Sequence, residues 1–245
     1  MSVNVRKVEW PEAMKMLRML EQVRPWSGLA LFCGMLAWCV GLIFFRIERT
    51  GSEYFLFLIW NLFLACIPLF ASRLLQAAHA RRVPDVLQLV LLAVWLVFLP
   101  NAPYILTDLI HLHPGPTRLY WYDMAMLLSC GGVGLMLGYS SMFDVHRVVE
   151  ARFGERVAWV VAAGTLLLSG FGIYLGRALR WNSWDIVTNP RGLFDFIAEC
   201  LLNPGTYLHI WAISGLSGAG LLFGYVTLHW MSASRQPLVA ERAIN

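Results

Sequence analysis

The chain has 245 residues, of which 58% are hydrophobic and only 14% are charged, and its mean hydropathy is +0.61. A soluble globular domain carries roughly 25% charged residues, so this composition excludes an ordinary soluble protein and indicates a polytopic membrane protein. The formal net charge is +4. In a membrane protein a surplus of Lys and Arg indicates which loops face the cytoplasm. It therefore gives no reason to expect a nucleic-acid partner.

Six apolar runs are long enough to cross a bilayer core of about 30 Å, which needs about 20 helical residues. In chain order they cover 27–45, 54–71, 84–106, 122–143, 157–176 and 207–231. The connections between them are too short for a soluble domain. The sequence therefore predicts an all-α membrane protein: one domain over 27–231, a bundle of six transmembrane helices whose third helix is broken at Pro100 and Pro103.

The basic residues predict how this bundle is oriented. The amino-terminal segment, the second-to-third and fourth-to-fifth connections and the tail carry 13 Lys and Arg, whereas the other side carries six. The positive-inside rule then places both termini in the cytoplasm and the connections 46–53, 107–121 and 177–206 outside. Residues 1–26 have no signal cleavage pattern, so we expect a retained cytoplasmic amphipathic leader, followed at the far end by a cytoplasmic tail over 232–245.

The break in the third run lies near the outer side of the membrane. Residues 84–99 span roughly 24 Å of helix before the prolines begin. Pro100 and Pro103 have no backbone N–H to donate to the preceding turn, so we expect irregular backbone that protein groups or a wet cavity satisfy. Asn101, between the two prolines, can supply donors and an acceptor.

A cluster of titratable residues follows the break. Asp108 and His111 are three residues apart, on one face of a helical turn, and His113 follows. An Asp and a His could perform acid/base chemistry on a headgroup, or begin a zinc or manganese site that Asp123 or Asp185 completes. The pattern specifies neither the metal nor any other cofactor. A plainer interpretation is that the Asp and the His satisfy freed backbone or pair with an arginine of the next motif.

This second motif is GRALRWNSWD, residues 176–185. Arg177 and Arg180 each lie four residues before a tryptophan, Trp181 and Trp184. This pattern is typical of a belt at the membrane interface, but two guanidinium groups can also clamp an anionic headgroup. Asn182 and Ser183 favour the clamp, because a belt needs no amide and hydroxyl between its tryptophans. We expect Asn101, Arg177, Arg180, Asn182 and Asp185 to bind a ligand, and 190–203 to form an interfacial helix or lid beside them.

The remaining features concern helix packing. Small residues recur four apart in the last three spans, at Gly134 and Gly138, Gly172 and Gly176, Ser214 and Gly218, and Gly220 and Gly224. They predict close helix approach within the bundle or, as an alternative, a homo-oligomer or a membrane-protein partner. Asn61 is expected to make an interhelical hydrogen bond. No Asp, Glu, Lys, Arg or His lies in the middle of a predicted span, which disfavours a pump or an ion-coupled carrier.

Two segments carry a family resemblance. FLPNAPYILTDLIHL, residues 98–112, and YLGRALRWNSWDI, residues 174–186, resemble the two signature segments of a bacterial integral membrane protein family known only as a domain of unknown function, family 1361. The resemblance covers the helical bundle and leaves out the first 25 residues and the tail. It implies a polytopic protein of the bacterial inner membrane, and it brings no reaction, cofactor or partner.

The sequence thus favours an inner-membrane protein with an outward-facing polar site that binds or acts on a lipid or a lipid-linked anionic group. Asp108 or His111 would be the acid/base group or metal ligand, with Arg177 and Arg180 as the anion clamp. Membrane lipids are then its expected partners. The alternatives are a non-catalytic assembly subunit, and a small-solute channel or carrier gated at the proline break. Whether the protein is an enzyme stays open at this point.

Overall fold

The structure is a computed structural model that describes the backbone of residues 10–112 and 119–233 and the side chains of 28–112 and 119–232. Within these ranges the regular elements are all helical. Six helical stretches are long and apolar enough to cross a membrane: Gly28–Thr50, Tyr54–Ala80, Asp85–His111, Tyr120–Phe153, Glu155–Ala178 and Leu208–Ser232. The predicted six-span, all-α membrane fold is therefore confirmed.

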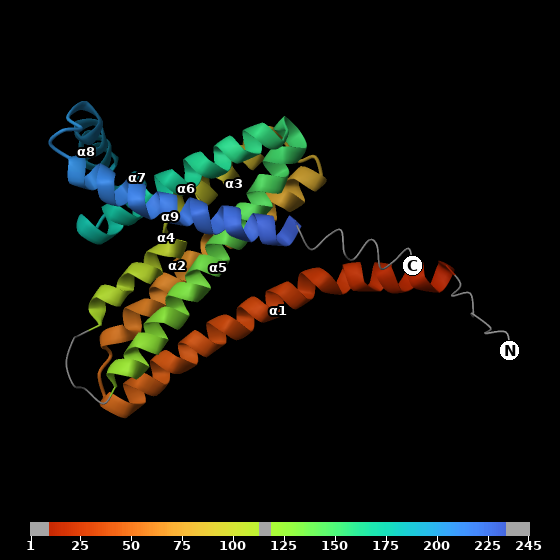
Figure 1. Cartoon of the computed structure of the whole chain (residues 1–245), viewed down its shortest axis with the longest axis horizontal. Coiled ribbons are helices and arrows are strands. Elements are labelled where there is room, and N and C mark those ends of the chain that lie inside the picture. The colour runs from red at the N-terminus through yellow and green to blue at the C-terminus, as the bar shows by residue number, and fades with distance from the viewer. Residues whose placement is uncertain (1–9, 113–118, 234–245) are drawn as a thin grey trace.

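Helix α1 (Trp10–Thr50) is continuous, so residues 10–26 of the predicted leader extend the same helix as the first span. It meets α5 (Tyr120–Phe153) near Thr50 and diverges from it toward the N-terminus (Figure 1). A short 3-10 helix, η1 (Tyr54–Leu56), leads into α2 (Phe57–Ala80). We call the end of the bundle where α1 ends and α5 begins the site end, and the end where α5 turns into α6 the opposite end.

Helix α6 (Glu155–Ala178) returns to the site end, where α7 (Asp185–Thr188) and α8 (Pro190–Leu202) follow it. The sequence predicted a helix over 190–203, and α8 confirms it. Helix α9 (Leu208–Ala233) then lies along α6 (Figure 1). Cys200 of α8 is buried in a small cluster with Phe171 and Ile210, which docks α8 on the ends of α6 and α9.

The third span changes its helical type at the two prolines. It consists of α3 (Asp85–Phe98), the single turn α4 (Asn101–Tyr104) and the 3-10 helix η2 (Ile105–His111). Leu99 and Pro100 keep right-handed helical dihedral angles, and the Ala102 N–H donates to the Leu99 carbonyl at 3.1 Å, which is the tighter spacing of a 3-10 turn. The predicted break is present, but as a tightened helix in place of the irregular backbone that we expected.

Side chains satisfy the carbonyl groups that the tightening releases. In a continuous α-helix the Val97 and Phe98 carbonyls would accept from the N–H groups four residues later. Here the Phe98 carbonyl accepts from Asn101 Nδ2 at 3.0 Å and the Val97 carbonyl accepts from Ser183 Oγ at 3.2 Å. Asn101 Nδ2 also donates to Ser183 Oγ at 2.7 Å, so the two signature segments meet at this point.

The tightened segment fits against glycines of two neighbouring helices. A Cβ atom at Gly134 of α5 would overlap with the Ala102 carbonyl oxygen, and one at Gly172 of α6 would lie 2.7 Å from Pro100 Cγ. Four residues further along α6, a Cβ at Gly176 would lie 3.1 Å from the Tyr104 ring. Two of the predicted glycine faces therefore hold the third span, because only a residue without a side chain allows this approach.

Some of the other small residues allow α9 to pack closely against α6 and α5. A Cβ at Gly170 of α6 would overlap with the Ser214 carbonyl oxygen, and one at Gly218 would lie 2.7 Å from Leu167 Cα. A Cβ at Gly224 would overlap with the Tyr139 hydroxyl, whereas Gly220 faces open space. Most of the motif glycines are therefore occupied by contacts within the chain.

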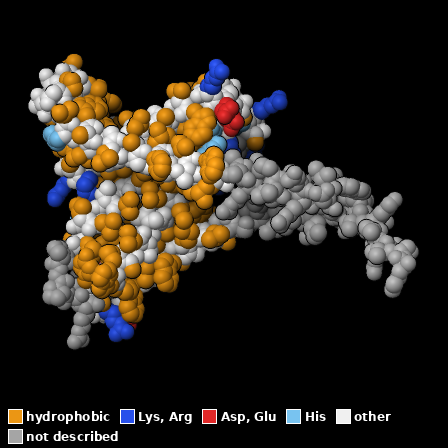
Figure 2. Space-filling view, viewed as in Figure 1, with side chains coloured by type: hydrophobic (Ala, Val, Ile, Leu, Met, Phe, Trp, Pro, Cys, Tyr) orange, Lys and Arg blue, Asp and Glu red, His pale blue; other side chains and the backbone are white. Residues whose placement is uncertain are grey.

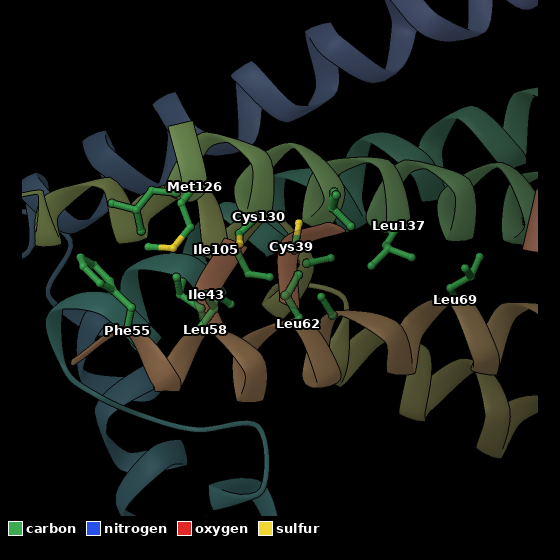
Figure 3. Close-up of a cluster of buried hydrophobic side chains, with 14 residues drawn as sticks. Cys39, Ile43, Phe55, Leu58, Leu62, Leu69, Ile105, Met126, Cys130 and Leu137 are labelled. Carbon is green, nitrogen blue, oxygen red and sulfur yellow. The ribbon is translucent and has the colours of Figure 1, made fainter. Parts of the chain in front are cut away.

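Two apolar clusters fill the bundle. Near the site end, Ile43, Leu58, Ile105 and Met126 point toward one another from α1, α2, η2 and α5 (Figure 3). A second cluster toward the opposite end includes the buried Trp95, and connects α2, α3, α5, α6 and α9. On the outside, exposed hydrophobic side chains are spread over the visible described face, as contact with lipid requires (Figure 2).

The glycine contacts predict a difference between two positions on α5. Gly134→Ala should lower the free energy of unfolding by about 1–3 kcal/mol, because the new methyl group overlaps with the Ala102 carbonyl. Gly132→Ala is the matched control, since a Cβ there meets nothing within 4 Å and alanine is the better helix former. Unfolding of the purified protein in detergent measures both, and equal stability of the two variants would contradict the close packing.

Candidate functional site

Asp108 is the centre of a polar network at the site end. It lies in η2, and its side chain is only 1% exposed. Asn61 Nδ2 of α2 donates to Asp108 Oδ2 at 2.9 Å, which is the interhelical hydrogen bond expected of Asn61. Arg177 Nη2 of α6 donates to Asp108 Oδ1 and forms an ion pair with it. Both carboxylate oxygens are therefore engaged, as burial of a charged group demands.

Each nitrogen of the Arg177 guanidinium group contacts another side chain. It belongs to the last turn of α6 and is 19% exposed. Its Nε donates to Thr107 Oγ1 at 2.9 Å, and its Cζ lies 4.3 Å from the centroid of the Tyr104 ring, a cation–π distance. Thr107 Oγ1 in turn donates to the Tyr104 carbonyl at 2.6 Å. The end of α4 and the start of η2, residues 104–108, thus supply a ring, a hydroxyl and an acid to one arginine.

His111 connects this buried pair to the surface. Its Nε2 lies 3.2 Å from Arg177 Nη1 and its Nδ1 lies 3.1 Å from the Tyr54 hydroxyl, and its side chain is 31% exposed. Because a guanidinium can only donate, Nε2 is the acceptor; the proton of the neutral imidazole is then on Nδ1 and is donated to Tyr54. Protonation of Nε2 would break the Arg177 contact and leave Asp108, 4.0 Å away, as the new partner.

Among the described contacts, the other predicted ligand-binding residues form no hydrogen bond with this network. Asn101 is engaged with Ser183 and the backbone, as described above. Arg180 is exposed and has a left-handed backbone conformation with φ of 59°. Asn182 is exposed, and its N–H donates to Asp185 Oδ2 at 2.6 Å, while Thr188 Oγ1 donates to Asp185 Oδ1 at 2.9 Å. Asp185 therefore shapes the connection after α6.

Asp123, which the sequence suggested as a possible metal ligand, instead forms an ion pair with Arg46. Arg46 of α1 binds both of its carboxylate oxygens, Nε to Oδ1 at 2.6 Å and Nη2 to Oδ2 at 3.1 Å. This pair joins α1 to α5 and is mostly buried. In the parts of the chain that the structure describes, no three His, Cys, Asp or Glu residues form a group that could hold a metal ion. His113 lies outside the described residues.

Several contacts of the network have no signal in the sequence pattern. Tyr54 contacts His111, and Tyr104 and Thr107 contact Arg177, yet only the position of Thr107 beside Asp108 was a signal. A second buried acid, Asp144, was missed because α5 runs ten residues beyond the predicted span end at 143, to Phe153. Its side chain is 2% exposed and binds three residues of α2: Arg73 Nε at 2.8 Å, Ser72 Oγ at 3.2 Å and Gln76 Nε2 at 3.0 Å.

Comparison with known proteins agrees with the resemblance of the two signature segments. The model of a family described as "Protein of unknown function (DUF1361)" matches residues 60–218, more than half of the chain. The matched region begins in α2 and ends within α9, so it includes the whole polar network except Tyr54 and leaves out α1. Comparisons with curated proteins and with solved structures gave no match.

The ion pair predicts unequal effects of two similar substitutions. Arg177→Gln should lower the free energy of unfolding by about 3–5 kcal/mol, because it leaves the Asp108 carboxylate buried without its cation. Arg180→Gln, three residues on at an exposed position, should change it by no more than about 0.5 kcal/mol. Adding Asp108→Asn to Arg177→Gln should recover part of the loss. Denaturation in detergent micelles measures all three, and an equal cost for both arginines would contradict the network.

Proposed function

Because the chain belongs to the DUF1361 family, whose function is not known, we propose its function from the geometry of the site. The protein binds a lipid or a lipid-linked anionic group at the outer boundary of the bacterial inner membrane. Arg177 and Arg180 attract the anion, and His111 is the group that exchanges a proton with it. The observation that carries this proposal is the buried Asp108–Arg177 ion pair with the partly exposed His111 on its open side.

The cost of the ion pair supports a functional role. Two charges removed from water are stabilised only by good geometry, and a well-packed apolar pair of similar volume often gives equal or higher stability. Ionisable groups inside membrane-spanning segments are accordingly expensive and usually mark a functional site. Here the buried side of the pair is hydrogen-bonded by Asn61 and Thr107, while its other side continues to the partly exposed His111.

The contacts divide the roles among three residues. Asp108 is too deeply buried to touch a ligand, so it is a positioning residue that fixes the Arg177 guanidinium. Arg177 Nη1 faces His111, the exposed side of the network. An incoming phosphate or carboxylate oxygen that takes this N–H frees His111 Nε2, which can then accept a proton from the ligand or return one to it.

The orientation of the site follows from the arginine and lysine count of the sequence. The positive-inside rule directs the site end away from the cytoplasm, which places the network at the level of the outer headgroups. An exposed Arg180 beside this level can attract anionic lipid before Arg177 binds it. The main role of the site in this proposal is to bind the anionic group, and His111 adds acid/base chemistry to it.

Anionic lipid should therefore stabilise the purified protein more than neutral lipid does. We expect phosphatidylglycerol to raise the midpoint of thermal unfolding relative to phosphatidylcholine. Arg180→Gln should lower the affinity about fivefold, since one arginine near an anionic surface contributes about 1 kcal/mol. His111→Gln should weaken binding with little change in the stability of the lipid-free protein. The difference between the lipids should vanish near 1 M salt, where the screening length is about 3 Å.

Arg156→Gln is the matched control, because Arg156 is exposed at the opposite end of the bundle. It should leave the response to phosphatidylglycerol unchanged. An equal response to both lipids, or an equal loss in Arg156→Gln and Arg180→Gln, would show that the site end does not bind the anion.

A further inference from the structure

A cluster of ring side chains with donor atoms lies toward the opposite end of the bundle. His146 belongs to α5, and Tyr225 and His229 lie four residues apart on one face of α9. The ring centroids of the two histidines are 5.3 Å apart, and the Tyr225 centroid is 5.9 Å from that of His146 and 6.0 Å from that of His229. The three rings therefore form a nearly equal-sided triangle between two helices.

Two polar atoms of this cluster are unusual for a buried environment. The His146 side chain is 3% exposed and the Tyr225 side chain is fully buried. Within the described residues, His146 Nδ1 and the Tyr225 hydroxyl have no hydrogen-bond partner. Burial of a polar group without a partner costs free energy, and an apolar side chain of similar size would avoid that cost. The two atoms therefore indicate a ligand that binds both a ring nitrogen and a phenol oxygen.

The spacing of the rings matches a metal site. Imidazole nitrogen binds zinc at about 2.0–2.1 Å, so two imidazoles at a tetrahedral angle have ring centroids about 5 Å apart. A phenol binds through an oxygen outside its ring, so its centroid should be about 6 Å from those of the imidazoles. The observed distances agree with both values. Imidazole is a ligand that suits zinc and copper in particular.

The neighbouring aromatic rings restrict the ligand to a small one. Trp159 of α6 packs against both histidines, with its ring centroid 5.0 Å from that of His146 and 4.8 Å from that of His229. Phe143 of α5 stacks on His229 at 5.9 Å. These contacts leave too little room for an organic molecule, whereas an ion needs only the space between its donors. His229 is partly exposed, which gives an ion a path from the surface.

We propose that His146, Tyr225 and His229 bind a divalent transition metal ion that links α5 to α9. The site is separate from the lipid site proposed above and does not depend on it. Its third donor is a phenol, so it is not a group of three His, Cys, Asp or Glu residues. The Tyr139 hydroxyl of α5 already donates to the Leu221 carbonyl of α9 at 3.1 Å, and the ion would extend this link to the last turns of α9.

Metal titration of the full-length protein, purified in detergent without a histidine tag, tests the site. We expect one zinc ion per chain and a higher midpoint of thermal unfolding with Zn²⁺ than with EDTA, because the ion binds only the folded protein. His146→Gln and His229→Gln should each lower the affinity at least about tenfold, since even residues that only orient a metal ligand contribute that much. Tyr225→Phe should also weaken binding, while it keeps the ring that packs in the cluster.

His209→Gln is the matched control. His209 is an exposed histidine in the first turn of the same helix, near the site end, so its substitution should leave the zinc affinity unchanged. The unmodified protein provides a second measurement, because a substitution at the buried His146 can disturb the fold. When it is loaded with Cu²⁺, its electron paramagnetic resonance spectrum should show coupling to the nitrogens of two imidazoles.

Three results would overturn the proposal. The first is no binding of zinc at micromolar concentration by the unmodified protein. The second is an equal zinc affinity of His146→Gln, His229→Gln and His209→Gln, since the ion would then be bound elsewhere. The third is a Cu²⁺ spectrum with coupling to a single imidazole, which would place the ion on one surface histidine.

Discussion

The missing backbone N–H groups of Pro100 and Pro103 are the constraint on which the rest of the structure depends. Within a membrane every carbonyl that loses its helical donor must find another. The Leu99 carbonyl, to which Pro103 cannot donate, accepts from the Ala102 N–H, and the Phe98 and Val97 carbonyls that this tightening releases accept from Asn101 and Ser183. The helix responds by tightening into 3-10 turns, and glycines of α5 and α6 allow those turns to pack closely. The two signature segments are therefore parts of one contact between the third and fifth spans.

The same tightening positions the charged groups. A 3-10 helix has three residues per turn, so residues three apart lie on one face. Asp108 and His111 share such a face, and Thr107 of the same 3-10 helix and Tyr104 at the end of α4 complete the surroundings of Arg177. Gly172 and Gly176 let α6 approach the third span closely. Arg177, the residue after Gly176, therefore reaches Asp108 directly. Backbone packing and the ion pair thus support each other.

The bundle has charged links at both ends and lipid-facing apolar surface between them. At the site end Arg46 binds Asp123 and Arg177 binds Asp108, while Asp144 binds residues of α2 toward the opposite end. These links join spans far apart in the sequence.

The sequence by itself determined the membrane class, the six spans and the position of the break, because length, hydropathy and the missing proline N–H are local properties. It also offered the pairing of Asp108 with an arginine as one of its alternatives. Only the tertiary structure decided that this arginine is Arg177, that Asp123 binds Arg46, and that Tyr54 contacts His111. Those contacts depend on which helices are neighbours and how closely they approach, and no local pattern in one sequence encodes that.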